Sequence, residues 1–291
     1  MDKKTIQKYY TKRIITNDDG EFVVGTLDEN NPEIYKAIKI AHFAHIGQMD
    51  KGGHPFIYHP ITLAEEQNSV DAIVTALLHD VIEDTPITLE DLRKEGIKEN
   101  VLEALDLLCH RKKDTYFDYF KKLEKNPLAY AVKQSDMKMN LDLNRLEFVR
   151  SKDAERQIRY ESAFKEYSEE EYANAINLSK DRTLRTKLAK NLRKISLEDL
   201  KEEKDWAELL GSLFSFFDEE MKDTKVLPAH HLVEYYVGKD ARPLEEAASF
   251  DATVAITTLR YLSSDRKEFE VAFKDGLVFA LVKSLKVSLF A

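Results

Sequence analysis

Apolar residues recur at helical spacing along most of the chain. The first such stripe follows Pro32, a residue favoured at helix starts, and its face holds Ile34, Ala37, Ile38, Ala41, Ala44 and His45. Residues 72–78 are apolar almost all round, which is typical of a central buried helix. Asn126 followed by Pro127 predicts another helix that runs to about Asp142. The pattern therefore predicts a mainly α protein.

One segment near the start has the pattern of a β-ribbon instead. Within residues 13–25, two β-rich runs flank Asp19-Gly20, which is a strong hairpin signal. We expect a small two-stranded hairpin within an N-terminal segment, residues 1–27, that leans on a larger domain because a lone hairpin is only marginally stable.

The composition changes near residue 150. Residues 150–171 are dense in alternating charge, which predicts a solvated helix with ion pairs one turn apart, at the junction of two domains. We place these domains at 28–165 and 166–291, both helical.

In the second domain, Ser168 with Glu171 predicts a capping box. Trp206 and the apolar residues after it predict the core side of a helix, and 264–289 a last helix interrupted at Gly276. The pair His230-His231 is interpreted as loop or surface.

Charge and composition narrow the class of protein. The 291 residues are 43% hydrophobic and 33% charged, as in globular proteins, and the net charge of -9 argues against a nucleic-acid partner. No apolar leader follows Met1, and the run 277–282 is far too short to span a membrane. The single cysteine, Cys109, is interpreted as a small buried side chain and fits a reducing cytoplasm.

The candidate chemistry lies in the first half, where six of the eight histidines fall within the first 110 residues. His79 and Asp80 follow the apolar run directly, and Glu83 and Asp84 come four residues after each of them. The side chains of these four titratable residues thus project from one side of a segment that is otherwise apolar. Burying that much charge without compensation is costly, and a cation is the simplest compensation.

Two further residues extend this set. His45 closes the first predicted helix, and Asp136 shares a helix face with Lys133 and Asn140. Two imidazoles and two carboxylates make a mixed nitrogen and oxygen site. Such a site suits Mn²⁺, Fe²⁺, Co²⁺ or Ni²⁺, or a catalytic Zn²⁺, with room left for water.

Four blocks appear in order: AHFAHIGQ at 41–48, PFIYHP at 55–60, ALLHDVIEDT at 76–85 and VKQSDMKMN at 132–140. Over roughly residues 28–165 the chain resembles the HD hydrolase domain of the Rel/Spo homologue enzymes, which remove the 3′-pyrophosphate from the alarmone (p)ppGpp. The resemblance implies an orthogonal helical bundle. The second half lacks the recognisable blocks of the alarmone synthetase domain, so we expect a bacterial HD subgroup without it.

The resemblance also implies roles for single residues. His45, His79, Asp80 and Asp136 would bind one Mn²⁺. The adjacent acids Glu83 and Asp84 would activate the attacking water. The substrate would meet Asn140, Lys36 near the base and Lys51 near phosphate.

The chain departs from the family pattern at Met49-Asp50-Lys51, because a basic residue of the family is replaced by Asp50. This change puts recognition of the guanine nucleotide in question. The Gly52-Gly53 turn leads us to expect that Asp50 points to solvent or pairs with Lys51.

Three functions follow as hypotheses. The first is hydrolysis of (p)ppGpp or a close nucleotide by a metal-dependent cytoplasmic enzyme. The second is an HD phosphohydrolase for a different nucleotide, which Asp50 favours. The third is a module that senses a nucleotide without turnover and uses the C-terminal half to bind a partner or a second copy of itself. The small-molecule nucleotide is the expected partner in all three, with no nucleic acid and no membrane.

Overall fold

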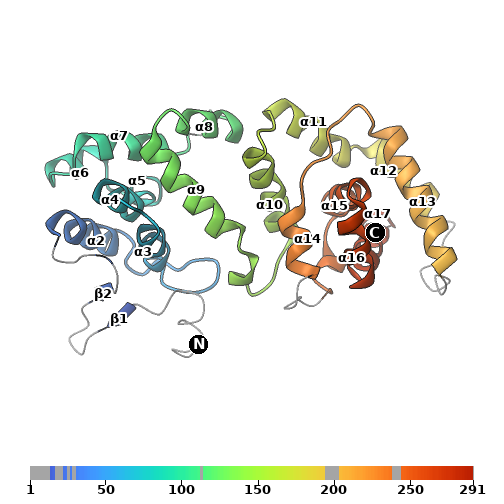
Figure 1. Cartoon of the computed structure of the whole chain (residues 1–291), viewed down its shortest axis with the longest axis horizontal. Coiled ribbons are helices and arrows are strands. Elements are labelled where there is room, and N and C mark those ends of the chain that lie inside the picture. The colour runs from blue at the N-terminus through green and yellow to red at the C-terminus, as the bar shows by residue number, and fades with distance from the viewer. Residues whose placement is uncertain are drawn as a thin grey trace. The chain divides into compact units, whose positions relative to one another are not determined.

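The computed structural model describes residues 14–16, 22–24, 27, 31–111, 114–193, 203–237 and 244–290, and these form helices almost throughout (Figure 1). The mainly α prediction is confirmed. Backbone contacts divide the chain into two compact units, Met1–Glu147 and Phe148–Ala291. None of the helices in the described ranges has both the length and the apolar character that crossing a membrane requires.

The first unit opens with two short strands, β1 (Ile14–Thr16) and β2 (Phe22–Val24), which pair antiparallel with Ile15 opposite Val23. The predicted Asp19-Gly20 turn between them lies outside the described residues. The helices that follow in this unit are α2 (Pro32–Ala44), α3 (Tyr58–Glu65), α4 (Val70–Leu78), α5 (Val81–Asp84), α6 (Leu89–Lys94), α7 (Glu99–Leu108), α8 (Tyr116–Leu123), α9 (Pro127–Leu141) and the 3-10 turn η1 (Leu143–Arg145).

Helix α4 is the centre of the first unit, as its apolar sequence predicts. It packs against α2, α3, α7 and α9, and its last three residues, Ala76, Leu77 and Leu78, are fully buried. Ser69 caps its N-terminus by accepting the Ala72 backbone N–H. The predicted helix start at Pro32 is also confirmed, with Asn31 as the N-cap of α2. A rigid apolar helix therefore ends directly at the residue before His79.

The second unit is built from helices too. Its elements are α10 (Ser151–Phe164), α11 (Glu169–Lys180), α12 (Arg182–Leu192), α13 (Glu203–Glu220), α14 (His230–Val237), the 3-10 turn η3 (Ala247–Ser249), α15 (Ala252–Ser264), α16 (Arg266–Lys274) and α17 (Leu277–Phe290). Helix α15 packs against α11, α13, α16 and α17 and forms the core. The predicted break at Gly276 is confirmed, because this glycine has a φ of 83° between α16 and α17.

The predicted division near residue 165 differs from the observed one. The structure divides between Glu147 and Phe148, so the charge-dense helix α10 belongs to the second unit. Ala154 and Ile158 on α10 are fully buried. The charged residues Asp153 and Glu161 on the same helix are almost fully buried. The prediction of a solvated helix was wrong for this face. Asp153 and Glu161 do form the ion pairs about one turn apart that the pattern predicts, with Arg156 and Lys165, but Glu161 also pairs with the distant His231, which the pattern does not reveal.

His230 and His231 are the first residues of α14 rather than loop residues. Their backbone N–H groups both donate to the buried Glu161 carboxylate, at 3.2 and 3.3 Å, so this side chain caps α14 from another helix. Their imidazoles remain partly exposed, as predicted for surface residues. His231 also forms an ion pair with Glu161, and His230 with Glu268.

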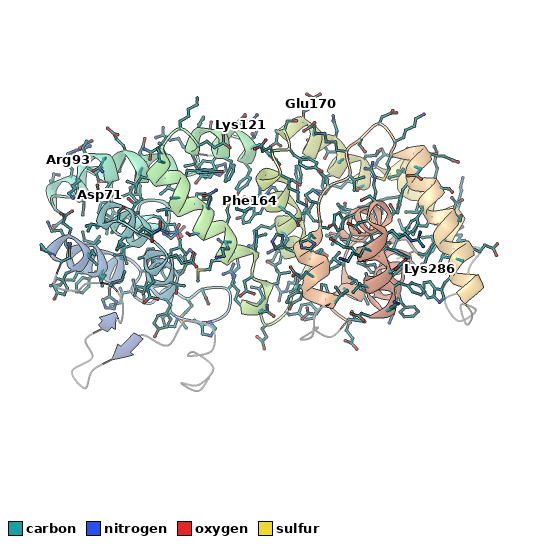
Figure 2. The ribbon with its side chains drawn as sticks, in the orientation of Figure 1. Asp71, Arg93, Lys121, Phe164, Glu170 and Lys286 are labelled. Atoms are coloured by element: carbon teal, nitrogen blue, oxygen red, sulfur yellow. The ribbon has the colours of Figure 1, made fainter. Side chains whose placement is uncertain are left out.

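Arg260 of α15 is the buried cation of the second unit. Its guanidinium donates to the carbonyls of Met221, Thr224 and Lys225 and to the Thr224 hydroxyl, at 2.7–3.1 Å. These carbonyls follow the end of α13, where unsatisfied acceptors gather. Other charged side chains, such as Arg93, Lys121 and Glu170, extend from the surface of their units (Figure 2).

Candidate metal centre

Three helices of the first unit bring titratable side chains together in its interior. His59 is the second residue of α3, and Asp136 lies in the middle of α9. His79 and Asp80 occupy the turn between α4 and α5, rather than one continuous helix as the sequence suggested. His59, His79 and Asp136 are all less than 10% exposed. Non-local packing therefore assembles the site.

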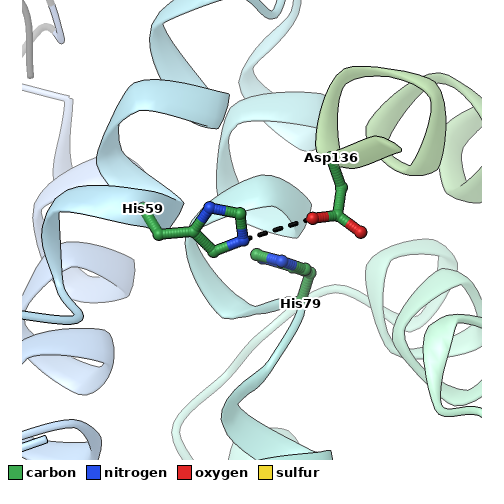
Figure 3. Close-up of side chains that lie close together, drawn as sticks. All are labelled: His59, His79 and Asp136. Carbon is green, nitrogen blue, oxygen red and sulfur yellow. Dashed lines mark ion pairs between the residues drawn. The ribbon is translucent and has the colours of Figure 1, made fainter. Parts of the chain in front are cut away.

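The side chains of this cluster converge on one point. One atom each of His59, His79 and Asp136 lie within 4.8 Å of one another (Figure 3). His59 Nε2 is 3.3 Å from Asp136 Oδ1 and 3.6 Å from Asp80 Oδ2, and His79 Nε2 is 3.0 Å from the same Asp80 oxygen. Imidazole nitrogens and carboxylate oxygens at this spacing form a donor set suited to a divalent transition metal.

The orientation of His79 fits a metal ligand. Its Nδ1 lies 2.8 Å from the backbone carbonyl oxygen of Ala76, and because a carbonyl only accepts, this nitrogen carries a hydrogen. Its buried Nε2, although close to Asp80, makes no hydrogen bond of normal geometry. A histidine whose Nδ1 is fixed by a carbonyl and whose Nε2 is available is the usual arrangement of a metal-bound imidazole.

His45 has the same arrangement. It follows the last residue of α2 and is 3% exposed. Its Nδ1 lies 2.8 Å from Gln48 Oε1, and the Gln48 amide nitrogen donates to the Asp84 carbonyl, which fixes the orientation of the amide. The buried His45 Nε2 has no hydrogen-bond partner. The His45 ring contacts Phe56, whose ring contacts His59, so it adjoins the cluster without joining the group of three.

Asp136 is held by its own helix. Lys133 Nζ lies 2.8 Å from one carboxylate oxygen and the Asn140 amide donates to the other at 2.6 Å. Burial would raise the pKa of Asp136, but Lys133, and then His59, hold it well below its usual range. The shared face of Lys133, Asp136 and Asn140 that the sequence predicted is thus confirmed, and it keeps Asp136 ionised.

The buried carboxylates change the basicity of their neighbours. Burial by itself would lower the pKa of His79, but the Asp80 and Asp136 carboxylates raise it to about 9. In turn, the pKa of Asp80 is lowered, because the attraction of His79 and His59 outweighs the effect of burial. A proton and a cation compete for the same Nε2 atom of His79, so metal binding there releases a proton.

The acidic pair at the end of α5 divides into two different environments. Glu83 accepts the backbone N–H of His110 at 3.2 Å, which holds it toward the loop after α7. Burial raises the pKa of Asp84, the Asp80 carboxylate raises it further, and His45, His79 and His59 oppose this. The pKa of Asp84 therefore depends on the charges of the cluster.

The predicted substrate-binding residues are spread more widely. Asn140 lies at the cluster, with its amide engaged by Asp136 and by Arg145. Lys51 is exposed on the loop before α3. Lys36 is nine residues before His45 on α2, about 180° around the helix. It donates to the Glu95 carbonyl and lines a groove of about 820 Å³ with Tyr35, Lys39 and Phe43.

Asp50 does not point to solvent, which was the first of the two orientations expected for it. Its carboxylate is 6% exposed and accepts the backbone N–H groups of Gly52 and His54, at 2.9 and 2.8 Å. The side chain thus folds its own loop. Gly52 is required in that loop, because a Cβ there would lie 2.7 Å from the Arg145 carbonyl oxygen. The Asp50 charge is satisfied locally by backbone donors.

His59 is the functional residue that the sequence interpretation missed. It was noted in the block at 55–60 but given no role, because a histidine at a helix start carries no signal of its own. Its position inside an apolar helix, with Ile57, Ile61 and Leu63 buried around it, was the available signal. A histidine on the buried face of an amphipathic helix requires a polar partner there.

No protein-family model matches the chain. Part of the chain is similar to curated (p)ppGpp enzymes. A guanosine-3′,5′-bis(diphosphate) 3′-pyrophosphohydrolase of Borreliella burgdorferi is 42% identical over 77 residues, and that of Haemophilus influenzae 50% over 71. The bifunctional (p)ppGpp synthase/hydrolase SpoT of Escherichia coli is 38% identical over 98 residues. These matches cover 23–30% of this chain and only 10–14% of the relatives.

Proposed function

We propose that this chain is a metal-dependent phosphohydrolase that removes the 3′-pyrophosphate from (p)ppGpp or a closely related nucleotide. The observation that carries the proposal is the pair of buried imidazoles, His45 and His79, each with Nδ1 fixed by an oxygen acceptor and Nε2 without a hydrogen bond. His79 adjoins the carboxylates of Asp80 and Asp136, and His45 influences the charge of Asp84. The similarity to named 3′-pyrophosphohydrolases supports the same chemistry.

His45, His79, Asp80 and Asp136 are the proposed ligands, and Mn²⁺ is the proposed metal, with Fe²⁺, Co²⁺, Ni²⁺ or Zn²⁺ compatible with the same donors. When bound, a divalent cation supplies Lewis acidity that acidifies water and neutralises charge on phosphoryl oxygens. His59 is proposed as a neighbouring imidazole that balances Asp136, since its Nε2 already faces that carboxylate at 3.3 Å.

The other residues around the site are proposed to activate water, to position a loop and to bind the substrate. Asp84 is proposed to accept the proton of the attacking water, because it responds to the cluster charges and is not held elsewhere by its carboxylate in any described hydrogen bond. Glu83, which is bound to the His110 N–H, positions the loop that borders the site. Lys51 and Asn140 are the proposed contacts to the substrate. Lys36 is left out, because it faces away from His45.

A second candidate is an HD phosphohydrolase for a different nucleotide. The observation that favours it is the position of Lys36, the basic residue expected near the guanine base, on the far face of α2. Either enzyme is proposed to act in the cytoplasm, where nucleotide substrates occur and where a lone cysteine such as Cys109 stays reduced.

The test is release of pyrophosphate by the full chain with Mn²⁺, across ppGpp, pppGpp, GTP and other nucleoside polyphosphates. We expect 3′-pyrophosphate release from ppGpp that disappears in His79→Ala and persists in His42→Ala, a histidine on the same helix as His45 but outside the cluster. Release from another nucleotide alone would replace the first candidate with the second. Tight binding without turnover of any nucleotide would support the sensing module instead.

A further inference from the structure

A basic surface lies on α12 of the second unit. Four cationic residues of α12 and its C-terminal end line the same pocket: Arg182, Arg185, Lys190 and Arg193. Together with Ser288 and Leu289 near the end of α17, they line a pocket of about 340 Å³. We call these residues the α12 pocket. None of the residues described in its lining is acidic, although the chain carries a net charge of -9.

The cations of the α12 pocket differ in what holds them. Arg185 is anchored, because its guanidinium donates to the Ser179 carbonyl and the Thr253 hydroxyl. Arg193 stacks over the Phe290 ring at 5.4 Å. Arg182 and Lys190 are exposed, and within the described parts of the chain neither forms an ion pair. Two cations are thus preorganised, and two are available to a ligand.

Lys187 on the same helix provides the contrast. It points away from the α12 pocket and forms an ion pair with Glu220 of α13 at 2.7 Å. The Lys187 charge is therefore neutralised outside the pocket, whereas the four cations that line the pocket lie close together. Like charges held together destabilise a helix face slightly, so an arrangement of this kind favours an anionic ligand that would relieve the repulsion.

We propose that the α12 pocket binds a compact, multiply charged phosphate anion, such as the polyphosphate group of a nucleotide. Guanidinium groups match pairs of phosphate oxygens with two parallel hydrogen bonds, and Ser288 offers a further donor. A volume of about 340 Å³ falls at the small end of the range for ligand sites and suits a few phosphate groups. The negative chain as a whole disfavours a long nucleic acid, which needs an extended basic track.

The site contains no residue of the metal centre, so its test is independent of the proposed hydrolase activity. The full chain, freed of metal on a chelating resin, is titrated with inorganic tripolyphosphate in a calorimeter. We expect one binding event in wild type and an affinity lower by about tenfold or more in Arg182→Gln/Lys190→Gln, since two charge-assisted contacts are lost. Both side chains are exposed, so the variant should fold, as fluorescence of Trp206 will check.

The control is Lys187→Gln, which removes one charge from α12 at a position outside the pocket lining and should leave the affinity within about twofold. Equal affinity of wild type and the double variant, or no binding by wild type, would overturn the proposal. An equal loss in Lys187→Gln would show unspecific attraction to α12 and would overturn it as well. Binding of a 20-nucleotide RNA more tightly than tripolyphosphate would replace the small anion with a nucleic acid.

Discussion

The two units both bury ionisable side chains, and they differ in how those side chains are satisfied. In the second unit, Glu161 accepts two backbone N–H groups and Arg260 donates to three carbonyls, so each charge completes a helix end. In the first unit, His45 and His79 each have a buried Nε2 without a hydrogen bond, and His79 lies beside Asp80 and Asp136. Glu161 and Arg260 thus hold helix ends together, whereas two buried imidazoles with a fixed Nδ1 and a free Nε2 point to a ligand of the first unit.

The largest expected effect separates the two acids of α5. Asp84→Asn should slow turnover by about 10²–10⁴-fold, the range for a lost general base, while the metal content stays unchanged. Glu83→Gln should slow it by about tenfold or less, because Glu83 is bound to the His110 N–H. Steady-state rates with pyrophosphate detection measure both. A larger loss in Glu83→Gln than in Asp84→Asn would reverse these assignments.

A second change removes the satisfied cation of the other unit. Arg260→Met should lower the free energy of unfolding by about 2–4 kcal/mol, because buried carbonyls lose their donor. Urea unfolding followed by Trp206, the one tryptophan of the chain, reports on the second unit.

The control for that change is Arg266→Met on α16. The Arg266 side chain is 92% exposed, so this substitution should change the free energy of unfolding by less than about 0.5 kcal/mol. The loss in Arg260→Met should be the same with and without a chelator. A loss that appeared only with metal present would contradict the view that Arg260 is architectural.

A third comparison lies within the metal centre. His45→Ala should weaken binding of Mn²⁺ by about a hundredfold or more, since loss of an outer-shell partner alone usually costs about 10–100-fold. His59→Ala should retain close to one equivalent of metal, because we propose His59 as the ionic partner of the carboxylates that its Nε2 faces, Asp136 and Asp80, and not as a ligand. Metal content after equilibrium dialysis decides between them. Loss of metal in His59→Ala alone would transfer the ligand role to His59.

The smallest effect is a pH dependence in the second unit. Burial would raise the pKa of Glu161, but His231 lowers it, and Glu161 raises the pKa of His231. The Glu161 contribution is present above its ordinary pKa of 4.5 and is lost as the pH falls below that value. The His231 contribution is complete below its ordinary pKa of 6.5 and is lost as the pH rises through the raised value.

The pair should therefore stabilise the second unit most between these two values. Glu161→Gln should lower stability by about 1–2 kcal/mol near pH 5.5, the usual cost of a lost helix cap and ionic partner, and by less near pH 9. Unfolding of wild type and variant, followed by Trp206 at both pH values, gives the difference. A difference that does not change with pH would assign the whole effect to the capping hydrogen bonds.

Local sequence signals predicted the fold well where the signal and its cause lie in the same helix. The helices predicted from Pro32 and from Asn126-Pro127 begin at those residues, and Ser168 with Glu171 forms the predicted capping box. The helix α10 and its ion pairs one turn apart were predicted, but its exposure was wrong for one face, because α14 and α15, which pack against it, lie far along the chain. His231, which pairs with Glu161, comes 70 residues later. No periodicity within α10 contains that information.

The same limit applies to the candidate site. His79, Asp80 and Asp136 were predicted from motifs, and the structure brings these three together. His59 was missed, and Asp50 was expected to point to solvent or pair with Lys51, because the contacts of both depend on how the chain folds around them. His59 reaches Asp136 only where α3 meets α9, and Asp50 turns inward only because the loop presents the Gly52 and His54 N–H groups.

The amide of Gln48 has a consequence for which substitutions the first unit can tolerate. Its oxygen accepts a hydrogen bond from His45 Nδ1, and its nitrogen donates one to the Asp84 carbonyl. One planar group therefore connects the His45 side chain to the backbone of Asp84. Glutamate has the same length but cannot donate, lysine cannot accept, and asparagine is one methylene shorter. Among the coded residues only glutamine joins these two neighbours, which makes position 48 less exchangeable than several of the charged residues around it.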